Sequence, residues 1–215
     1  YYDKENDTKE LFAGLKISKD TSFDENINKY DVIKINMQEF LSATQSMDDM
    51  LKLLQKRILA DLRNKYPEFV TEENLVFVMQ DVFAKTNSPF IILIDEWDCL
   101  FREYEQDRDA QKKYLDFLRF WLKDKEYIAL AYMTGILPIK KYGTHSALNM
   151  FDEFSMISPG PLAEYVGFTE AEVKQLCEKY QMDLEEVKNW YDGYSFEQVP
   201  SVYSPRSVVN CMRFR

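Results

Sequence analysis

The apolar and polar positions of the chain form short strand-like runs separated by longer helix-like stretches. Residues 30–37 (YDVIKINM) alternate apolar and polar side chains, which predicts a strand near a sheet edge. Two uninterrupted apolar runs, 89–95 (PFIILID) and 127–135 (YIALAYMTG), predict strands buried on both faces, as in the parallel sheet of an α/β protein. Residues 153–158 (EFSMIS) predict one further short strand.

Amphipathic helices are predicted between these strands. Ser46 can cap a helix whose apolar positions continue to Leu62, a second helix opens at Thr71, and residues 112–122 form a third. Strands and helices that alternate at this spacing predict a three-layer α/β fold with a parallel sheet.

The pattern changes after Pro161. A final helix is predicted from residue 206, after a loop rich in Gly, Pro and Ser. Two short helices before that loop each open with a capping box, which pairs Thr169 with Glu172 and Asp183 with Glu186. We therefore predict an α/β core over residues 1–160 and a small helical subdomain over residues 161–215.

The composition is that of a globular protein, with 46% hydrophobic and 30% charged residues. A net charge of −10 disfavours a broad nucleic-acid-binding face, which depends on Lys and Arg. Three widely spaced cysteines and one histidine argue against a zinc site or a disulfide framework, and favour a reducing, cytoplasmic compartment. The apolar runs are too short to cross a membrane.

Adjacent carboxylates follow the first of the two apolar strands. Four apolar residues, Asp95 and Glu96 make the Walker B pattern IILIDE. Asp95, last on a rigid strand, can accept hydrogen bonds from waters bound to Mg²⁺, while Glu96 can polarise a water for attack on a terminal phosphoryl group. A strand that simply ends in solvent would also carry acidic residues, so this run alone leaves both interpretations open.

Thr134 ends the second apolar strand, and the carboxyl ends of parallel strands are where functional side chains gather. Its hydroxyl could sense the terminal phosphate or orient the attacking water. A phosphate-binding loop, Gly-x-x-x-x-Gly-Lys-Ser/Thr, is absent, because none of the six glycines fits that spacing. The sequence therefore predicts only part of a nucleotide site.

Five strings along the chain are similar, in order, to a family of prokaryotic AAA-ATPase-like proteins. The similarity extends from about residue 11 to about residue 209, and WYDGY is its most specific part. This chain departs from the usual strings in three places: Trp97 replaces a tyrosine, Arg206 replaces a tryptophan, and SALNM replaces SGLNN. The five strings are FIILIDEWD, YMTGILPIKK, YVGFTEAEVKQL, VKNWYDGYSF and VYSPRSVVN.

The resemblance implies a P-loop ATPase fold whose Walker A strand precedes residue 1, so that the chain would be a fragment that does not bind ATP normally by itself. It assigns the magnesium-linked acid to Asp95, the catalytic acid to Glu96 and the sensor-like position to Thr134, with ATP and Mg²⁺ as ligands. Members often carry a PD-(D/E)XK nuclease-like domain at the carboxyl end. A homo-oligomer and such a nuclease domain are therefore candidate partners.

Other candidate residues carry weaker signals. His145 stands in a loop, where a lone histidine is usually a bystander or a cap. Lys140, Lys141 and Arg206 could approach nucleotide phosphates, but a solvated surface position is the favoured interpretation of each. Asp192 and Gly193 predict a turn, with Trp190, Tyr191 and Tyr194 packing the subdomain against the sheet. Two function classes stay open: an ATPase that drives an effector, and a non-hydrolysing interaction module that keeps the ATPase fold.

Overall fold

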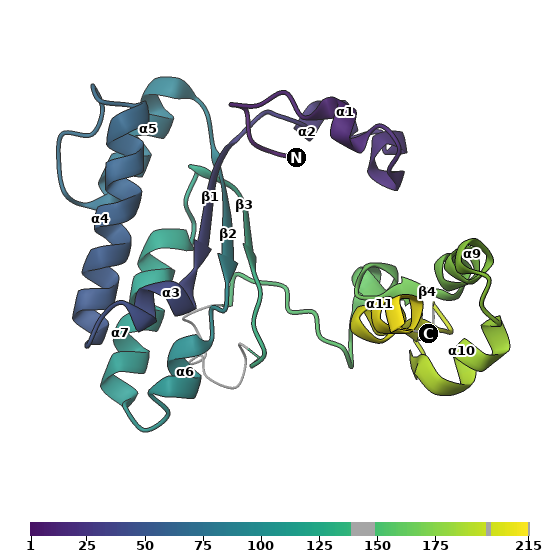
Figure 1. The fold of residues 1–215 in the computed structure, drawn as a ribbon. Helices are drawn as coiled ribbons and strands as arrows, with labels where there is room; N and C mark the ends of the chain where they lie inside the picture. Colours follow the sequence, from purple (N-terminus) through teal and green to yellow (C-terminus); the bar gives the residue numbers. More distant parts are fainter. Residues whose placement is uncertain (139–148, 197–198, 215) are drawn as a thin grey trace. The chain divides into compact units, whose positions relative to one another are not determined.

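Three parallel strands form the sheet of the first of two units, Tyr1–Phe151 (Figure 1). The computed structural model describes residues 1–138, 149–196 and 199–214. The strands are β1 (Asp31–Asn36), β2 (Phe90–Asp95) and β3 (Ile128–Met133), in the order β1-β2-β3. The strands predicted from residues 30–37, 89–95 and 127–135 therefore form, and β1 lies at an edge of the described sheet, as its alternating pattern indicates.

Capping side chains determine where the long helices begin. Ser46 accepts a hydrogen bond from the amide of Asp49 and starts α4 (Met47–Lys65), as predicted. The predicted start of the next helix at Thr71 is wrong. Asn74 accepts hydrogen bonds from the amides of Val76 and Phe77, so α5 begins at Leu75. The remaining helices of this unit are α1 (Lys9–Phe12), η1 (Lys16–Lys19), α2 (Phe23–Asn26), α3 (Met37–Ser42), α5 (Leu75–Thr86), α6 (Cys99–Glu103) and α7 (Arg108–Leu122).

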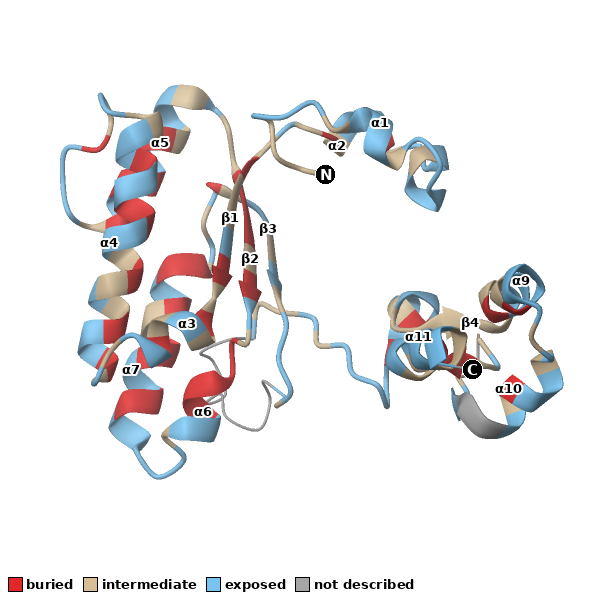
Figure 2. Ribbon diagram, in the orientation of Figure 1, coloured by how far each residue is buried: buried red, intermediate tan, exposed pale blue. Residues whose placement is uncertain are grey.

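Helices α4, α5 and α7 cover one face of the sheet, and their buried residues face the strands (Figure 2). On β3, by contrast, Leu130 is 38% exposed and Tyr132 is 50% exposed. The prediction that residues 127–135 form a strand buried on both faces is therefore wrong. Two layers, one of helices and one sheet, are described in this unit, because no described helix covers the exposed face of β3.

A buried carboxylate fixes the N-terminal segment to the start of β1. Asp31 accepts hydrogen bonds from the Lys4 ammonium (2.7 Å) and the Tyr66 hydroxyl (2.6 Å), and Lys65 lies 2.5 Å from its other oxygen. Burial alone would raise the pKa of Asp31, but these three donors together hold it below its ordinary value. The ionised Asp31 thus ties three segments of the chain together.

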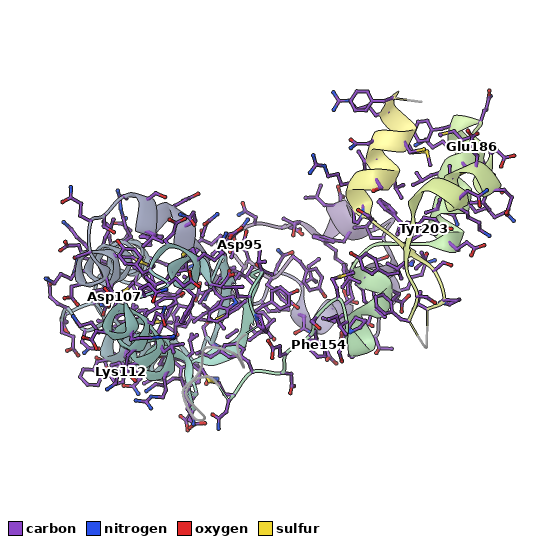
Figure 3. The ribbon with its side chains drawn as sticks, turned by 90° about the horizontal axis from the view of Figure 1, so that it is seen from below. Asp95, Asp107, Lys112, Phe154, Glu186 and Tyr203 are labelled. Carbon is purple, nitrogen blue, oxygen red and sulfur yellow. The ribbon has the colours of Figure 1, made fainter. Side chains whose placement is uncertain are left out.

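The second unit, Asp152–Arg215, has its own small core around Val173, Val187 and the fully buried Tyr203 (labelled in Figure 3). The capping box of Thr169 and Glu172 is present, and Asp183 accepts a hydrogen bond from the amide of Glu186. The elements of this unit are η2 (Gly160–Tyr165), β4 (Phe168–Thr169), α9 (Glu170–Tyr180), α10 (Leu184–Tyr191), β5 (Asp192–Tyr194), β6 (Val202–Tyr203) and α11 (Pro205–Phe214).

Two predictions about this part of the chain are wrong. The turn predicted at Asp192 and Gly193 is the strand β5, which pairs antiparallel with β6, so the unit contains a small sheet as well as helices. Residues 153–158 do not form a strand. The amides of Ser155 and Ser158 bond to each other's carbonyls at 3.1 and 3.0 Å, and a lone segment without a neighbouring strand cannot complete a ladder.

Where the structure describes the chain, it contains no helix that is both long and apolar enough to span a membrane.

Candidate functional site

The carboxyl ends of the three parallel strands bring the predicted site residues together. In the register of the sheet, Asn36 is paired with Asp95, and Ile94 is paired with Met133, the residue before Thr134. Asp95 is exposed at the tip of β2 (labelled in Figure 3). The apolar strand residues anchor this tip, because Ile92 and Ile94 are buried beneath the helices.

Asp95 and Thr134 are in direct contact. The Thr134 hydroxyl donates a hydrogen bond to Asp95 Oδ1 at 2.5 Å. The backbone holds the pair in place, because the Thr134 amide donates to the Ile94 carbonyl (2.9 Å) and the Trp97 amide donates to the Thr134 carbonyl (3.1 Å). In the described part of the chain, Asp95 Oδ2 accepts no hydrogen bond, so one carboxylate oxygen is free to face a ligand.

Glu96 marks the point where the chain leaves the strand. Its φ of 53° lies in the left-handed region, which is uncommon for a residue with a side chain and is often found at functional sites. The Glu96 amide donates to Asp95 Oδ1 at 3.0 Å. In a continuing strand, adjacent side chains point to opposite faces of the sheet. The change of backbone direction at Glu96 removes this restriction on the carboxylates of Asp95 and Glu96.

The loop that follows joins Glu96 to an arginine that sequence reasoning did not identify. Arg102, in α6, forms an ion pair with Glu96, and its Nε lies 3.5 Å from Asp98 Oδ2. Asp98 is fully buried, and its Oδ2 also accepts hydrogen bonds from the amides of Ile136 (3.2 Å) and Leu137 (2.9 Å). The spacing of Asp98 and Arg102, four residues apart, is the one signal in the sequence that points to this contact.

The buried thiol of Cys99, next to Asp98, is protonated near neutral pH. Cys99 is fully buried, and burial raises the pKa of its thiol to about 12. The protonated thiol is a poor nucleophile and a poor metal ligand near neutral pH.

The donor set at the strand tips suits a hard cation only in part. No group of three or more His, Cys, Asp or Glu side chains that could hold a metal ion occurs among residues 1–138, 149–196 and 199–214. Mg²⁺, however, keeps several waters and is often held by one or two carboxylates together with the phosphates of its nucleotide. The exposed Asp95 fits that role, whereas a protein-only metal cage does not fit these residues.

The remaining predicted residues either lie outside the described residues or belong to the second unit. Lys140, Lys141 and His145 lie outside the described residues, as do the side chains of Trp190 and Tyr191. Arg206 is exposed in the first turn of α11, in the second unit. Tyr194 is 44% exposed and stacks on Phe196 at 6.3 Å between ring centroids.

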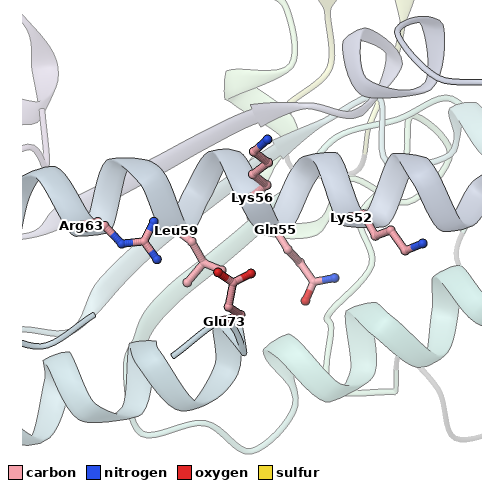
Figure 4. Close-up of a pocket in the computed structure, with 6 residues that line it drawn as sticks. All are labelled: Lys52, Gln55, Lys56, Leu59, Arg63 and Glu73. Carbon is pink, nitrogen blue, oxygen red and sulfur yellow. The ribbon is translucent and has the colours of Figure 1, made fainter. Parts of the chain in front are cut away.

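A hollow of about 430 Å³ lies along α4, away from the strand tips (Figure 4). None of the residues predicted to act on nucleotide lines it. It is lined by three cations, one carboxylate, one amide and one apolar side chain: Lys52, Gln55, Lys56, Leu59, Arg63 and Glu73.

Comparison with known proteins gives one match. The model of a family described as "Predicted AAA-ATPase" covers residues 1–144, which is more than half of the chain. No curated protein matches the chain. No solved structure matches it either.

Proposed function

The chain belongs to the predicted AAA-ATPase family, and from that premise we propose that it carries the Walker B half of an ATP-hydrolysing site. The observation that supports this proposal best is the hydrogen bond from Thr134 to Asp95, which joins the tips of adjacent parallel strands. A strand that merely ended in solvent would not need its last carboxylate to be bonded to the end of the neighbouring strand.

Each residue has a separate role in this proposal. Asp95 would hold a magnesium ion through the waters of that ion, and Thr134 fixes the orientation of the carboxylate. When bound, Mg²⁺ neutralises charge on the β- and γ-phosphates of ATP. Glu96 accepts a hydrogen bond from the attacking water, polarises it and directs it toward the terminal phosphoryl group.

The phosphate-binding loop is proposed to lie on a segment outside these 215 residues. The 215-residue sequence has no Gly-x-x-x-x-Gly-Lys-Ser/Thr motif. Among the described residues, no strand pairs with the second edge of β3, near the exposed Leu130 and Tyr132, so this edge can pair with one more parallel strand. Such a strand would extend the sheet and end beside Thr134, where a phosphate-binding loop would face Asp95.

The proposed activity is hydrolysis of ATP coupled to an effector, for which a nuclease-like domain is one candidate through the family resemblance. A homo-oligomer, which could supply an arginine to a neighbouring site, also belongs to the proposal. The competing function is a module that keeps the fold without hydrolysing nucleotide.

ATP turnover by the full-length protein tests this function. We expect Glu96→Gln to lower the turnover number by about 100-fold or more, the usual loss when a general base is removed, and to leave ATP binding intact. Glu103→Gln is the matched control, because Glu103 is exposed in α6 and has no ion pair within the described residues. Equal turnover in the wild type and Glu96→Gln would reject the role of Glu96, and a wild type that binds ATP without turnover would favour the module.

A further inference from the structure

Arg102 connects the proposed catalytic carboxylate to a buried anchor. Its guanidinium forms an ion pair with Glu96 Oε2 through Nη2, while its Nε faces Asp98 Oδ2 at 3.5 Å. An arginine can hold two carboxylates in this way, because its donors point in fixed directions from a planar group. The two contacts set the position of the guanidinium between the strand tip and the interior.

Asp98 is well suited to act as the anchor. Its side chain is fully buried, and Oδ2 accepts the amides of Ile136 and Leu137 in the loop after Thr134. Its other oxygen has no hydrogen-bond partner in the part of the chain that the structure describes. A buried carboxylate in this position is stabilised by a nearby cation, so Arg102 and Asp98 hold each other in place.

Glu96 by itself is weakly held. Its side chain is 36% exposed and has three rotatable bonds, so without a partner it would sample several rotamers. Arg102 binds only Oε2, and Oε1 accepts no hydrogen bond within the described residues. The ion pair therefore restricts the side chain and still leaves one oxygen for a water.

From these contacts we infer that Arg102 is a positioning residue for Glu96. Arg102 and the buried Asp98 hold the carboxylate in one orientation and connect it to the loop at residues 135–137, next to Thr134. This inference rests on the proposed function, because it assigns Arg102 a role in the reaction that Glu96 would catalyse. Arg102 itself does not touch nucleotide in this arrangement.

Steady-state ATP turnover by the full-length protein tests the inference with Arg102→Gln. We expect kcat to fall about 10- to 100-fold, the range of loss when a contact that orients a functional group is removed, while KM for ATP changes less than about twofold. The kcat of Arg102→Lys should fall less than that of Arg102→Gln, because lysine keeps the positive charge but lacks the planar guanidinium that contacts both carboxylates. Arg119→Gln is the control, since it removes an arginine of an exposed ion pair with Asp116 and leaves the site untouched.

A double-mutant cycle separates the outcomes. If Arg102 acts through Glu96, Arg102→Gln causes no further loss in a Glu96→Gln background. An equal further loss there, or a rise in KM for ATP with kcat unchanged, overturns the inference, because Arg102 would then act on the nucleotide or on the fold. If Glu96→Gln loses its ATP turnover and Arg102→Gln keeps the wild-type rate, this inference alone is rejected. If Glu96→Gln itself keeps the wild-type rate, the proposed function is rejected.

Discussion

Gly135, directly after Thr134, leaves no room for a side chain unless its neighbours shift. A Cβ atom built there would be 2.5 Å from Asp98 Oδ1 and 2.6 Å from Trp97 Cδ1. Both neighbours are held, because Asp98 is fully buried and Trp97 is 3% exposed. The absence of a side chain at Gly135 therefore lets the loop after β3 approach the Asp98 carboxylate closely.

We expect Gly135→Ala to lower the free energy of unfolding of the first unit by about 1–3 kcal/mol, the usual penalty for overpacking a filled site. Chemical denaturation monitored by tryptophan fluorescence measures it. Gly14→Ala is the matched control, because nothing lies within 4 Å of its Cβ position, and we expect a change within about 0.5 kcal/mol. Equal stability of the two variants would contradict the close approach at Gly135.

At the scale of the elements, the buried Asp31 links the N-terminal segment to β1 and α4. Its donors lower its pKa below the ordinary value of 3.8, despite the opposing effect of burial. Folding therefore favours the ionised form. The resulting stabilisation is complete above the unfolded pKa of about 3.8 and is lost as the pH falls through the lower, folded pKa.

Asp31→Asn tests this link. At neutral pH we expect the variant to be roughly 2 kcal/mol less stable, since it loses hydrogen bonds to charged donors. The difference from the wild type should shrink at a pH below 3.8, the ordinary pKa, because the unfolded wild-type chain then takes up a proton at Asp31 that the folded state resists. Urea unfolding at both pH values measures the effect. Asp48→Asn, in an exposed pair with Lys113, should change stability by less than about 1 kcal/mol.

The sequence predicted those elements whose signals are local. The period of apolar residues located β1, β2 and α4, and the side chain of Ser46 marked the start of α4. Burial could not be predicted in the same way. The apolar run of β3 indicates a strand covered on both faces, but coverage depends on neighbouring segments, and β3 lies at the edge of the described sheet.

The candidate site was likewise predictable only where its signals are local. Asp95 and Thr134 end apolar runs, so parallel pairing alone brings them together, and the structure places them in contact. Glu96 pairs with Arg102 from a backbone with a positive φ, and no sequence pattern specifies that φ. Their roles in catalysis stay predictions until turnover is measured.

At the scale of the whole molecule, the chain divides into two compact units, each with its own core. In the second unit, a Cβ atom at Gly167 would be 2.5 Å from the backbone oxygen of the fully buried Tyr203. Gly167 thus allows β6 to lie close to the chain just before β4. Because the obstacle is a backbone atom in a paired strand, it cannot turn aside as a flexible side chain would.

We expect Gly167→Ala to destabilise the second unit alone. Calorimetry of the wild type should resolve two transitions. An overpacking penalty of about 1–3 kcal/mol should lower the transition temperature of the second unit, Asp152–Arg215, by at least about 4 °C. Gly135→Ala should move only the other transition, which makes the two variants reciprocal controls. A single transition that shifts as a whole in both variants would mean that the two cores unfold as one cooperative unit.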